Sequence, residues 1–178
     1  KWLLRLTLLL ALLFVGVGFL LPEVSRVQRD ITIARPTPEV FATLNSFRRF
    51  NDWSPWFPRD PQAEYAFEGP PSGVGAALRW ASEKRDVGRG SQRIVASDPE
   101  RRIDVGLAFA GQGQAQAPNV LVPVEGGTRV RWEFETRHGN NVLSRWFGLG
   151  FDRWIGADYE NGLAKLKVML ESDPLQPP

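Results

Sequence analysis

The amino-acid sequence predicts an α+β fold: an antiparallel sheet covered by a long C-terminal helix and preceded by a membrane-spanning helix. Three observations predict it. An uncharged apolar run covers residues 6–21, short segments of alternating polarity follow one another between residues 63 and 136, and apolar residues then recur every three or four positions up to residue 171. Alternation is typical of strands and the longer period of helices. Strands in succession followed by a helix favour an α+β fold.

The apolar run at residues 6–21 is expected to be a membrane anchor. Extended to residue 2, it approaches the roughly 20 residues that a helix needs to cross a bilayer. A cleaved secretory signal is the alternative, but the run lacks a small-x-small cleavage site and Pro22 follows it directly. A buried core helix is disfavoured, because apolar residues surround the helix instead of forming one stripe.

Charges flanking this run predict its orientation. Lys1 and Arg5 precede it, whereas the two arginines that follow are diluted by two acidic residues. Basic residues ahead of a short anchor favour a cytoplasmic N-terminal side. We therefore expect a single-pass protein with its soluble domain on the periplasmic or extracellular side. The expected division is an anchor over residues 1–21, a linker over 22–26, a ligand-binding domain over 27–172 and a flexible tail over 173–178.

Composition limits the classes of function. The 178 residues include 22 basic and 20 acidic side chains, a net charge of +2 that gives no reason to expect a nucleic-acid partner. Cysteine is absent, which excludes disulfides and thiolate metal sites, and His138 is the single histidine. We expect neither a metal nor another cofactor. Nothing in the sequence indicates the oligomeric state.

Residues 27–34 alternate in polarity and are expected to form the first strand. A proline-rich turn follows, after which Thr37 is expected to cap a short helix that Pro38 opens. The apolar face of that helix would carry Val40, Phe41 and Leu44.

Residues 50–60, FNDWSPWFPRD, form the most informative segment of the chain. Pro55 and Pro58 exclude a regular helix or a central strand across it. An apolar segment broken by prolines must bury its rings against a core edge or at the mouth of an apolar cavity. This favours a protein that encloses a hydrophobic ligand. The rings belong to Phe50, Trp53, Trp56 and Phe57.

Six further strands are expected, at residues 63–67, 76–80, 88–97, 102–109, 112–124 and 128–136. Turn signals separate them, including a hairpin at Gly126. Residues 141–171 are expected to form one long helix that begins at Asn140 or Asn141. Its glycines lower its intrinsic stability, so tertiary packing must hold it. Its apolar stripe, which should face the sheet, comprises Phe147, Phe151, Trp154, Ile155, Tyr159, Leu163, Leu166 and Leu170.

Four segments of the chain resemble the START-like superfamily, also called SRPBCC or helix-grip, and its polyketide cyclase/dehydrase branch in particular. They are residues 31–47 (ITIARPTPEVFATLNSF), 50–56 (FNDWSPW), 88–95 (GRGSQRIV) and 148–167 (GLGFDRWIGADYENGLAKLK). The resemblance implies a curved seven-stranded antiparallel sheet around the C-terminal helix, with an apolar cavity between them. Members bind lipids, sterols or polyketides, and a minority are enzymes. Pro118 departs from the family pattern and predicts a bulge or break in its strand.

Aromatic residues are the candidate ligand site. They could form an ordinary core or line a cavity, and the sequence leaves both interpretations open. Those proposed for a cavity wall or lid are Trp53, Trp56, Phe57, Trp80, Phe109, Trp132, Phe134, Phe151 and Tyr159.

The sequence assigns no catalytic residue. An enzyme of cyclase or dehydratase type would need a buried titratable group, for which Asp104, His138 and Asp158 are the candidates. The sequence favours an ordinary turn residue over a general base for His138, and a solvated helix carboxylate over a catalytic acid for Asp158. Glutamines alternate at positions 112, 114 and 116, which favours the outer face of a strand over a site for a polar ligand group.

Membrane-tethered binding of a hydrophobic small molecule is therefore the predicted function. The alternatives are a cyclase or dehydratase acting on a hydrophobic substrate, and an envelope interaction module that binds no ligand.

Overall fold

The computed structural model describes residues 1–111 and 113–172. The expected tail at 173–178, and Gln112 of the glutamine series, lie outside the described residues. The helices are α1 (Trp2–Leu20), α2 (Thr37–Leu44), α3 (Phe50–Trp53), the 3-10 turn η1 (Phe57–Arg59), α4 (Val142–Gly148) and α5 (Phe151–Ser172). The strands are β1 (Val24–Ile33), β2 (Glu64–Glu68), β3 (Ala77–Ala81), β4 (Arg89–Asp98), β5 (Arg102–Phe109), β6 (Gly113–Gln116), β7 (Asn119–Val124) and β8 (Gly127–Arg137).

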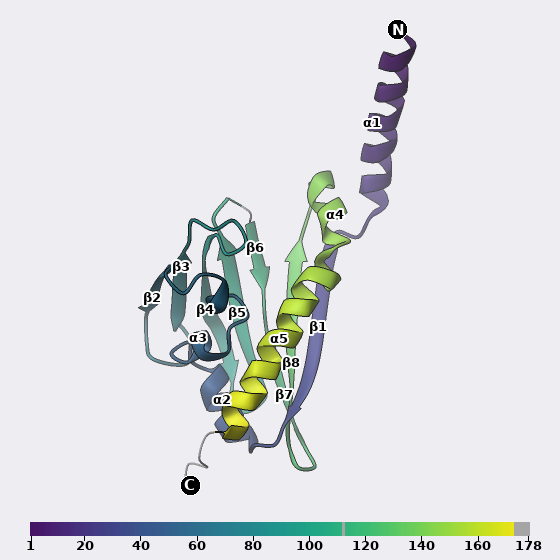
Figure 1. Ribbon diagram of the computed structural model, residues 1–178. Coiled ribbons are helices and arrows are strands. Elements are labelled where there is room, and N and C mark those ends of the chain that lie inside the picture. The colour runs from purple at the N-terminus through teal and green to yellow at the C-terminus, as the bar shows by residue number, and fades with distance from the viewer. Residues whose placement is uncertain (112, 173–178) are drawn as a thin grey trace.

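One antiparallel sheet of eight strands forms the body of the molecule, and α5 crosses one of its faces (Figure 1). The strand order is β1-β8-β6-β5-β4-β3-β2, and β7 pairs with both β5 and β8. This confirms the predicted α+β fold, with one more strand than the seven expected. Pro118 is the reason: it has no N–H for the ladder, so the strand expected at residues 112–124 divides into β6 and β7.

β1 starts at Val24, earlier than the sequence predicts and inside the stretch expected to be a linker. The cause is its partner. β8 runs on to Arg137, and its register pairs Val24 with Arg137, so the first strand has a neighbour over its whole length.

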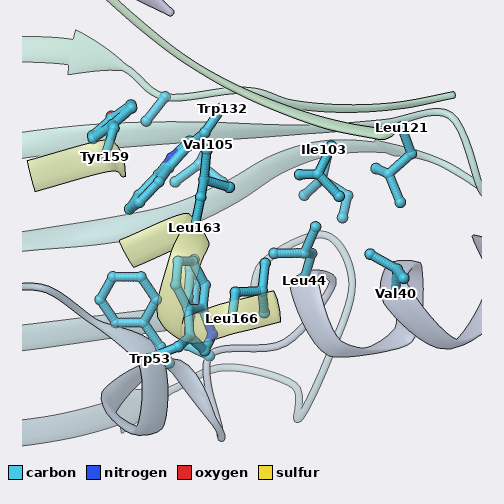
Figure 2. Packing of buried hydrophobic residues seen from close by; sticks show 14 of the residues in the cluster. Val40, Leu44, Trp53, Ile103, Val105, Leu121, Trp132, Tyr159, Leu163 and Leu166 are labelled. Atoms are coloured by element: carbon cyan, nitrogen blue, oxygen red, sulfur yellow. The ribbon is translucent and has the colours of Figure 1, made fainter. Parts of the chain in front are cut away.

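The core lies between the inner face of the sheet and the helices α2, α3 and α5 (Figure 2). Alternate residues of β8, namely Val130, Trp132 and Phe134, are buried there. From α5, the buried residues are Gly156, Tyr159, Gly162, Leu163, Leu166 and Leu170. A Cβ at Gly162 would lie 2.9 Å from the Trp132 ring and 3.1 Å from Pro55, so this glycine allows the helix to approach the sheet closely.

The predicted single C-terminal helix is two helices. α4 ends at Gly148, and α5 begins at Phe151 after a break at Leu149 and Gly150. Asn141 is confirmed as the N-cap of α4, where its side chain accepts the Ser144 N–H at 2.9 Å.

This break makes part of the predicted apolar stripe wrong. Phe147 and Trp154 were expected to face the sheet, yet each is 55% exposed. The break takes α4 out of the helical phase of α5, so Phe147 does not continue the α5 stripe. Trp154 stands in the first turn of α5, and its ring lies against Gly150.

The predicted cap of α2 is also wrong. Thr37 is the first residue of the helix, and Pro36 occupies the N-cap position. The buried Thr37 hydroxyl lies 3.0 Å from the Thr128 hydroxyl instead of bonding the helix N–H groups. Thr128 in turn donates to the carbonyl of Arg35 at 2.9 Å, so this contact joins the start of α2 to the sheet.

α1 stands apart from the body of the domain in Figure 1. Among the described residues it is the one helix long and apolar enough to cross a membrane. Gly18 is its one buried residue.

Candidate ligand-binding site

Residues 50–60 pack against Trp132 on the inner face of the sheet, and we call them the aromatic loop. A single turn of α3 ends before Pro55, and Pro58 lies in the first turn of η1. Between them the Ser54 hydroxyl accepts the N–H groups of Trp56 and Phe57 at 3.2 and 3.3 Å. Local sequence thus shapes the loop through two prolines and a serine turn.

Four rings of the predicted set pack together beneath this loop. Trp132 of β8 stacks on Tyr159 of α5 with ring centroids 3.8 Å apart. Trp53 and Trp56 of the aromatic loop meet Trp132 edge to face at 5.2 and 5.9 Å, and Trp56 also meets Tyr159 at 6.3 Å. We call these four residues the aromatic cluster. Figure 2 labels three of its members, Trp53, Trp132 and Tyr159.

Burial differs within the aromatic cluster. Trp53, Trp132 and Tyr159 are almost fully buried, whereas Trp56 is only partly buried. Burial also raises the pKa of the Tyr159 hydroxyl, so this residue stays neutral. The aromatic cluster is therefore an uncharged, apolar interior with its most accessible ring on the aromatic loop.

One carboxylate fastens the aromatic loop to α5. The Trp56 indole N–H donates to Asp158 Oδ2 at 3.0 Å, and Arg59 pairs with the other carboxylate oxygen. Asp158 immediately precedes Tyr159, so the same turn of α5 supplies a ring to the cluster and an anchor to the loop. The sequence suggested Asp158 only as a solvated or acid residue, because nothing in it shows that these partners meet.

Two buried side-chain N–H donors, one in the aromatic loop and one in the sheet, have no hydrogen-bond partner among the described residues. They are Trp53 Nε1 and Gln92 Nε2. Gln92 belongs to β4, where the register places it between Leu78 and Leu107 on the inner face of the sheet. An unpaired buried donor is costly, so a ligand oxygen bonded to either group would be favoured. Sequence reasoning missed Gln92, although a polar residue at an inward position of an alternating strand was the available signal.

Other residues of the predicted site form separate ring pairs. Phe57 meets Tyr65 at 5.4 Å at the outer edge of the aromatic loop. Trp80 meets Phe109 at 6.1 Å, and the two flank Gly90 across neighbouring strands. A third pair lies under the first turn of α5, where Phe134 and Phe151 are 6.0 Å apart.

The rings of the aromatic cluster fill the space between the sheet and α5. An open hollow of about 400 Å³ lies elsewhere, over strands β2 to β5, and Trp80 and Phe109 of the predicted site are among its lining residues. The pairing register sets four of its lining residues in one row across four strands: Ala66, Arg79, Ser91 and Ala108. A smaller hollow, of about 10 Å³, is bordered by Phe47 and Phe67, and neither hollow is lined by the aromatic cluster.

His138 is buried, although the sequence favoured an ordinary turn residue. It follows the end of β8. Its Nε2 lies 2.8 Å from the Ser25 hydroxyl and its Nδ1 lies 2.6 Å from the Ser144 hydroxyl. Burial, and to a lesser degree the positive charge of Arg145, lowers its pKa. The ring is therefore neutral at pH 7, and it lies 5.8 Å from Phe151.

Asp104 is not near the aromatic cluster. Its neighbours in β5, Ile103 and Val105, point inward, so Asp104 lies on the outer face, where it accepts from Arg102 at 2.7 Å. Within the described ranges 1–111 and 113–172, no group of three or more His, Cys, Asp or Glu residues is placed to hold a metal ion.

An antiparallel sheet that holds a C-terminal helix over an apolar, aromatic interior defines the helix-grip class of proteins. Within this class, the chain belongs to the family described as polyketide cyclase / dehydrase and lipid transport, whose sequence profile matches residues 25–171. Among curated proteins, none matches the chain significantly.

Solved structures share this fold at low sequence identity. A protein from Chromobacterium violaceum aligns with a TM-score of 0.61 at 12% identity, over 84% of this chain and 99% of its own. A protein of unknown function from Staphylococcus aureus gives 0.63 at 11% identity, over 84% and 95% of the two chains. The di-domain ARO/CYC StfQ from the steffimycin biosynthetic pathway gives 0.59 at 14%, over 83% of this chain and 51% of its own.

Proposed function

We propose that this protein binds a hydrophobic small molecule, of lipid, sterol or polyketide type, between the inner face of the sheet and α5, while α1 tethers it to a membrane. The observation that carries the proposal is the aromatic cluster, half of which belongs to a proline-broken loop fastened to α5 by one carboxylate. A cluster covered by such a loop can open, whereas rings on strands and long helices cannot move without disrupting the sheet.

Entry of a ligand would begin at Trp56, the partly buried ring. If the contacts of Trp56 and Arg59 with Asp158 break, the aromatic loop can swing outward and carry Trp53 and Trp56 away from Trp132 and Tyr159. The space that the two indoles leave would be lined mainly by apolar side chains. On the sheet, Gln92 Nε2 would be available as a donor to a carbonyl, hydroxyl or carboxyl oxygen of the ligand.

We extend the same proposal to the remaining predicted residues. Phe57 would belong to the lid, while Phe134 and Phe151 would form the wall near the first turn of α5. Trp80 and Phe109 would close the far end of the site. The family description, which names both polyketide cyclases and lipid transport, supports this class of ligand. So does the likeness to an ARO/CYC protein of a biosynthetic pathway.

Binding is favoured over catalysis by the state of the titratable groups. Both ring nitrogens of His138 lie within hydrogen-bond distance of serine hydroxyls. Both oxygens of Asp158 are engaged by the aromatic loop. A general acid or base must reach the proton that it transfers, so a cyclase or dehydratase would first have to release one of these groups.

Packing of α4 on α1 supports a retained anchor over a cleaved signal. Removal of α1 would expose the Trp146 ring, which stacks on Phe14 at 5.0 Å, and would strip Arg145 of two carbonyl partners. We propose an anchor over residues 1–21 and a ligand-binding domain over 27–172, joined by residues 22–26, of which Val24 to Arg26 already belong to β1. The basic N-terminal flank supports a domain on the periplasmic or extracellular side.

The binding proposal is tested with the chain starting at Pro22, by titration with fatty acids, sterols and aromatic polyketides while tryptophan emission is followed. We expect saturable quenching or a spectral shift. Trp56→Ala should weaken binding by about 1–3 kcal/mol, the scale of one buried aromatic side chain. Trp154→Ala is the matched control, because it removes an exposed indole outside the aromatic cluster. Absence of saturable binding for every ligand would favour an interaction module without a ligand.

The anchor is tested by fractionation. The full chain should remain in the membrane fraction after an alkaline carbonate wash, whereas the chain starting at Pro22 should be released. Release of the full chain by the wash would contradict the anchor.

A further inference from the structure

α4 is joined to α1 by close side-chain contacts. The Trp146 ring stacks on Phe14 at 5.0 Å, and its indole N–H donates to the Phe14 carbonyl at 3.2 Å. Gly18 of α1 is buried beneath Val142 and Trp146, and a Cβ at this position would collide with both. A small residue at a helix crossing lets the two backbones approach closely.

Arg145 locks this contact. Its side chain is only 3% exposed, and its guanidinium donates to the carbonyls of Phe19 and Leu21 at 3.0 and 3.1 Å. These carbonyls lie at the C-terminal end of α1, where the helix offers them no backbone partner. Glu23 and the Gly139 carbonyl accept the remaining N–H groups. These hydrogen bonds therefore fix the position of α4 along the axis of α1.

The contact of α4 with α1 lies within the proposed membrane-spanning part of α1, not beyond its C-terminal end. α1 has 19 residues. At about 1.5 Å per residue it is about 28 Å long, close to the roughly 30 Å of a bilayer's hydrocarbon core. Phe14 precedes the last residue of α1, Leu20, by six positions. It therefore lies about 9 Å along the axis from that end. A side chain stacked on Phe14 is thus at the level of the lipid acyl chains when α1 crosses the membrane.

The outward face of α4 has the composition that this depth requires. Leu143, Phe147 and Leu149 are 57%, 55% and 59% exposed, and the segment 142–149 contains no acidic residue. Its one basic residue, Arg145, is turned inward to α1. The exposed Trp154 ring lies over the junction with α5, and tryptophan favours the boundary between lipid and water.

We propose that α4 is a second membrane-contacting element, whose face of Leu143, Phe147 and Leu149 inserts into the headgroup–acyl boundary of the leaflet where α1 ends. The partner is the phospholipid bilayer. This inference rests on the anchor of the proposed function and deepens it. Insertion of α4 fixes the start of α5 against the lipid surface, and with it the Phe134–Phe151 pair, so the apolar interior lies next to the phase that holds hydrophobic ligands.

Because the chain contains no cysteine, single cysteines can report the depth of each position. The full chain is reconstituted in phosphatidylcholine–phosphatidylglycerol vesicles with a nitroxide on Leu143→Cys, Phe147→Cys or Leu149→Cys. Collisions of the nitroxide with dissolved oxygen and with a water-soluble nickel complex are compared. Val168→Cys, an exposed residue farther along α5, is the aqueous control, and Leu10→Cys reports α1 itself.

We expect labels at 143, 147 and 149 to collide more with oxygen and severalfold less with nickel than the label at 168. If the labels at 143, 147 and 149 collide with nickel as often as the label at 168 does, while the label at 10 is shielded from nickel, α1 is an anchor and insertion of α4 is disproved. If the label at 10 is also open to nickel, the anchor fails and this inference fails with it. If the unlabelled Phe147→Cys chain forms a disulfide-linked dimer in the vesicles when a mild oxidant is added, a second copy covers the face, which would also overturn the proposal.

Discussion

At the scale of single residues, Asp158 connects the candidate lid to the helix that closes the fold. It receives the Trp56 indole N–H and the Arg59 guanidinium on its two oxygens. Its side chain is 21% exposed and that of Arg59 is 35% exposed, so water weakens the ion pair but does not remove it. We call the contacts of Trp56 and Arg59 with Asp158 the latch. Interactions of this strength would hold the aromatic loop on α5 and still allow a fraction of the molecules to release it.

Asp158→Ala should lower the free energy of unfolding by about 1 kcal/mol, since it removes a partly exposed ion pair and an indole acceptor. Asp158→Asn should cost less, because the amide oxygen can still accept from Trp56. Urea unfolding followed by tryptophan emission measures both. Asp152→Asn on the same helix breaks an exposed pair with Arg29 and should change stability less than Asp158→Ala. Equal effects at 152 and 158 would contradict the latch.

His138 should make stability depend on pH. Burial lowers its pKa below the ordinary value of 6.5, so the unfolded chain binds its proton at a higher pH than the folded chain does. The stability that neutral His138 contributes is fully present above about pH 6.5 and is lost as pH falls from there to the lowered folded pKa.

His138→Gln should therefore flatten the decline in unfolding free energy between pH 7 and pH 5, measured by urea unfolding. Asp60, Asp152 and Glu171 also have lowered pKa values, but their ordinary values of 3.8, 3.8 and 4.5 place their losses at lower pH. An unchanged slope in the variant above pH 5 would argue against a buried neutral imidazole.

At the scale of elements, the packing of α5 against β8 holds the C-terminal helix on the sheet. Trp132 of β8 and Tyr159 of α5 stack face to face, and Gly162 allows the helix to come this close. The first turn of α5 is different, because the break after α4 leaves Trp154 outside the contact. Position along α5 therefore decides what each aromatic residue contributes.

Tyr159→Ala should lower the free energy of unfolding by about 3–5 kcal/mol, as for other large-to-small changes in a core. Trp154→Ala should stay within about 0.5 kcal/mol, because the residue is exposed. Tyr159→Phe should cost little, since the hydroxyl meets the Glu133 carbonyl only at 3.5 Å. Chemical unfolding of the three variants tests the grip. A larger loss of unfolding free energy for Trp154→Ala than for Tyr159→Ala would mean that α5 is rotated about its axis, with Trp154 facing the sheet.

At the scale of the whole molecule, Arg145 couples the domain to its proposed anchor. The guanidinium donates to the Phe19 carbonyl, the carboxylate of Glu23 and the nearby Gly139 carbonyl, so it ties the start of α4 to the C-terminal end of α1 and the residues that follow it. Loss of this one side chain should free the domain from α1 without unfolding either part.

Arg145→Ala in the full chain should speed proteolytic cleavage near Pro22 severalfold, because the α1 carbonyls lose their partners and the junction opens. Leaving such groups unpaired costs about 1–3 kcal/mol. Arg153→Ala, an exposed arginine on α5, is the control and should leave the cleavage rate unchanged. Equal protection in both variants would mean that α4 does not depend on Arg145 for its position.

Several features could be predicted from the sequence, because each depends on residues that are neighbours in the chain. The period of apolar residues predicts strands and the C-terminal helix, and the uncharged apolar run predicts the long apolar helix α1. Asn141 predicts the start of α4, and Pro118 predicts the division of β6 from β7. The prolines of the aromatic loop likewise predict its irregular shape. Backbone geometry and hydrogen-bonding capacity are local properties, so a single sequence contains them.

Only the tertiary structure decided which partners these elements meet. The period identified an apolar stripe at the C-terminus but not the break that exposes Phe147 and Trp154, because α4 is held by contacts with α1 through Arg145 and Trp146. In the same way, Asp158 and Gln92 have roles set by residues from other elements, as has the buried His138. Burial and pairing are properties of side chains far apart in the chain, and folding alone brings them together.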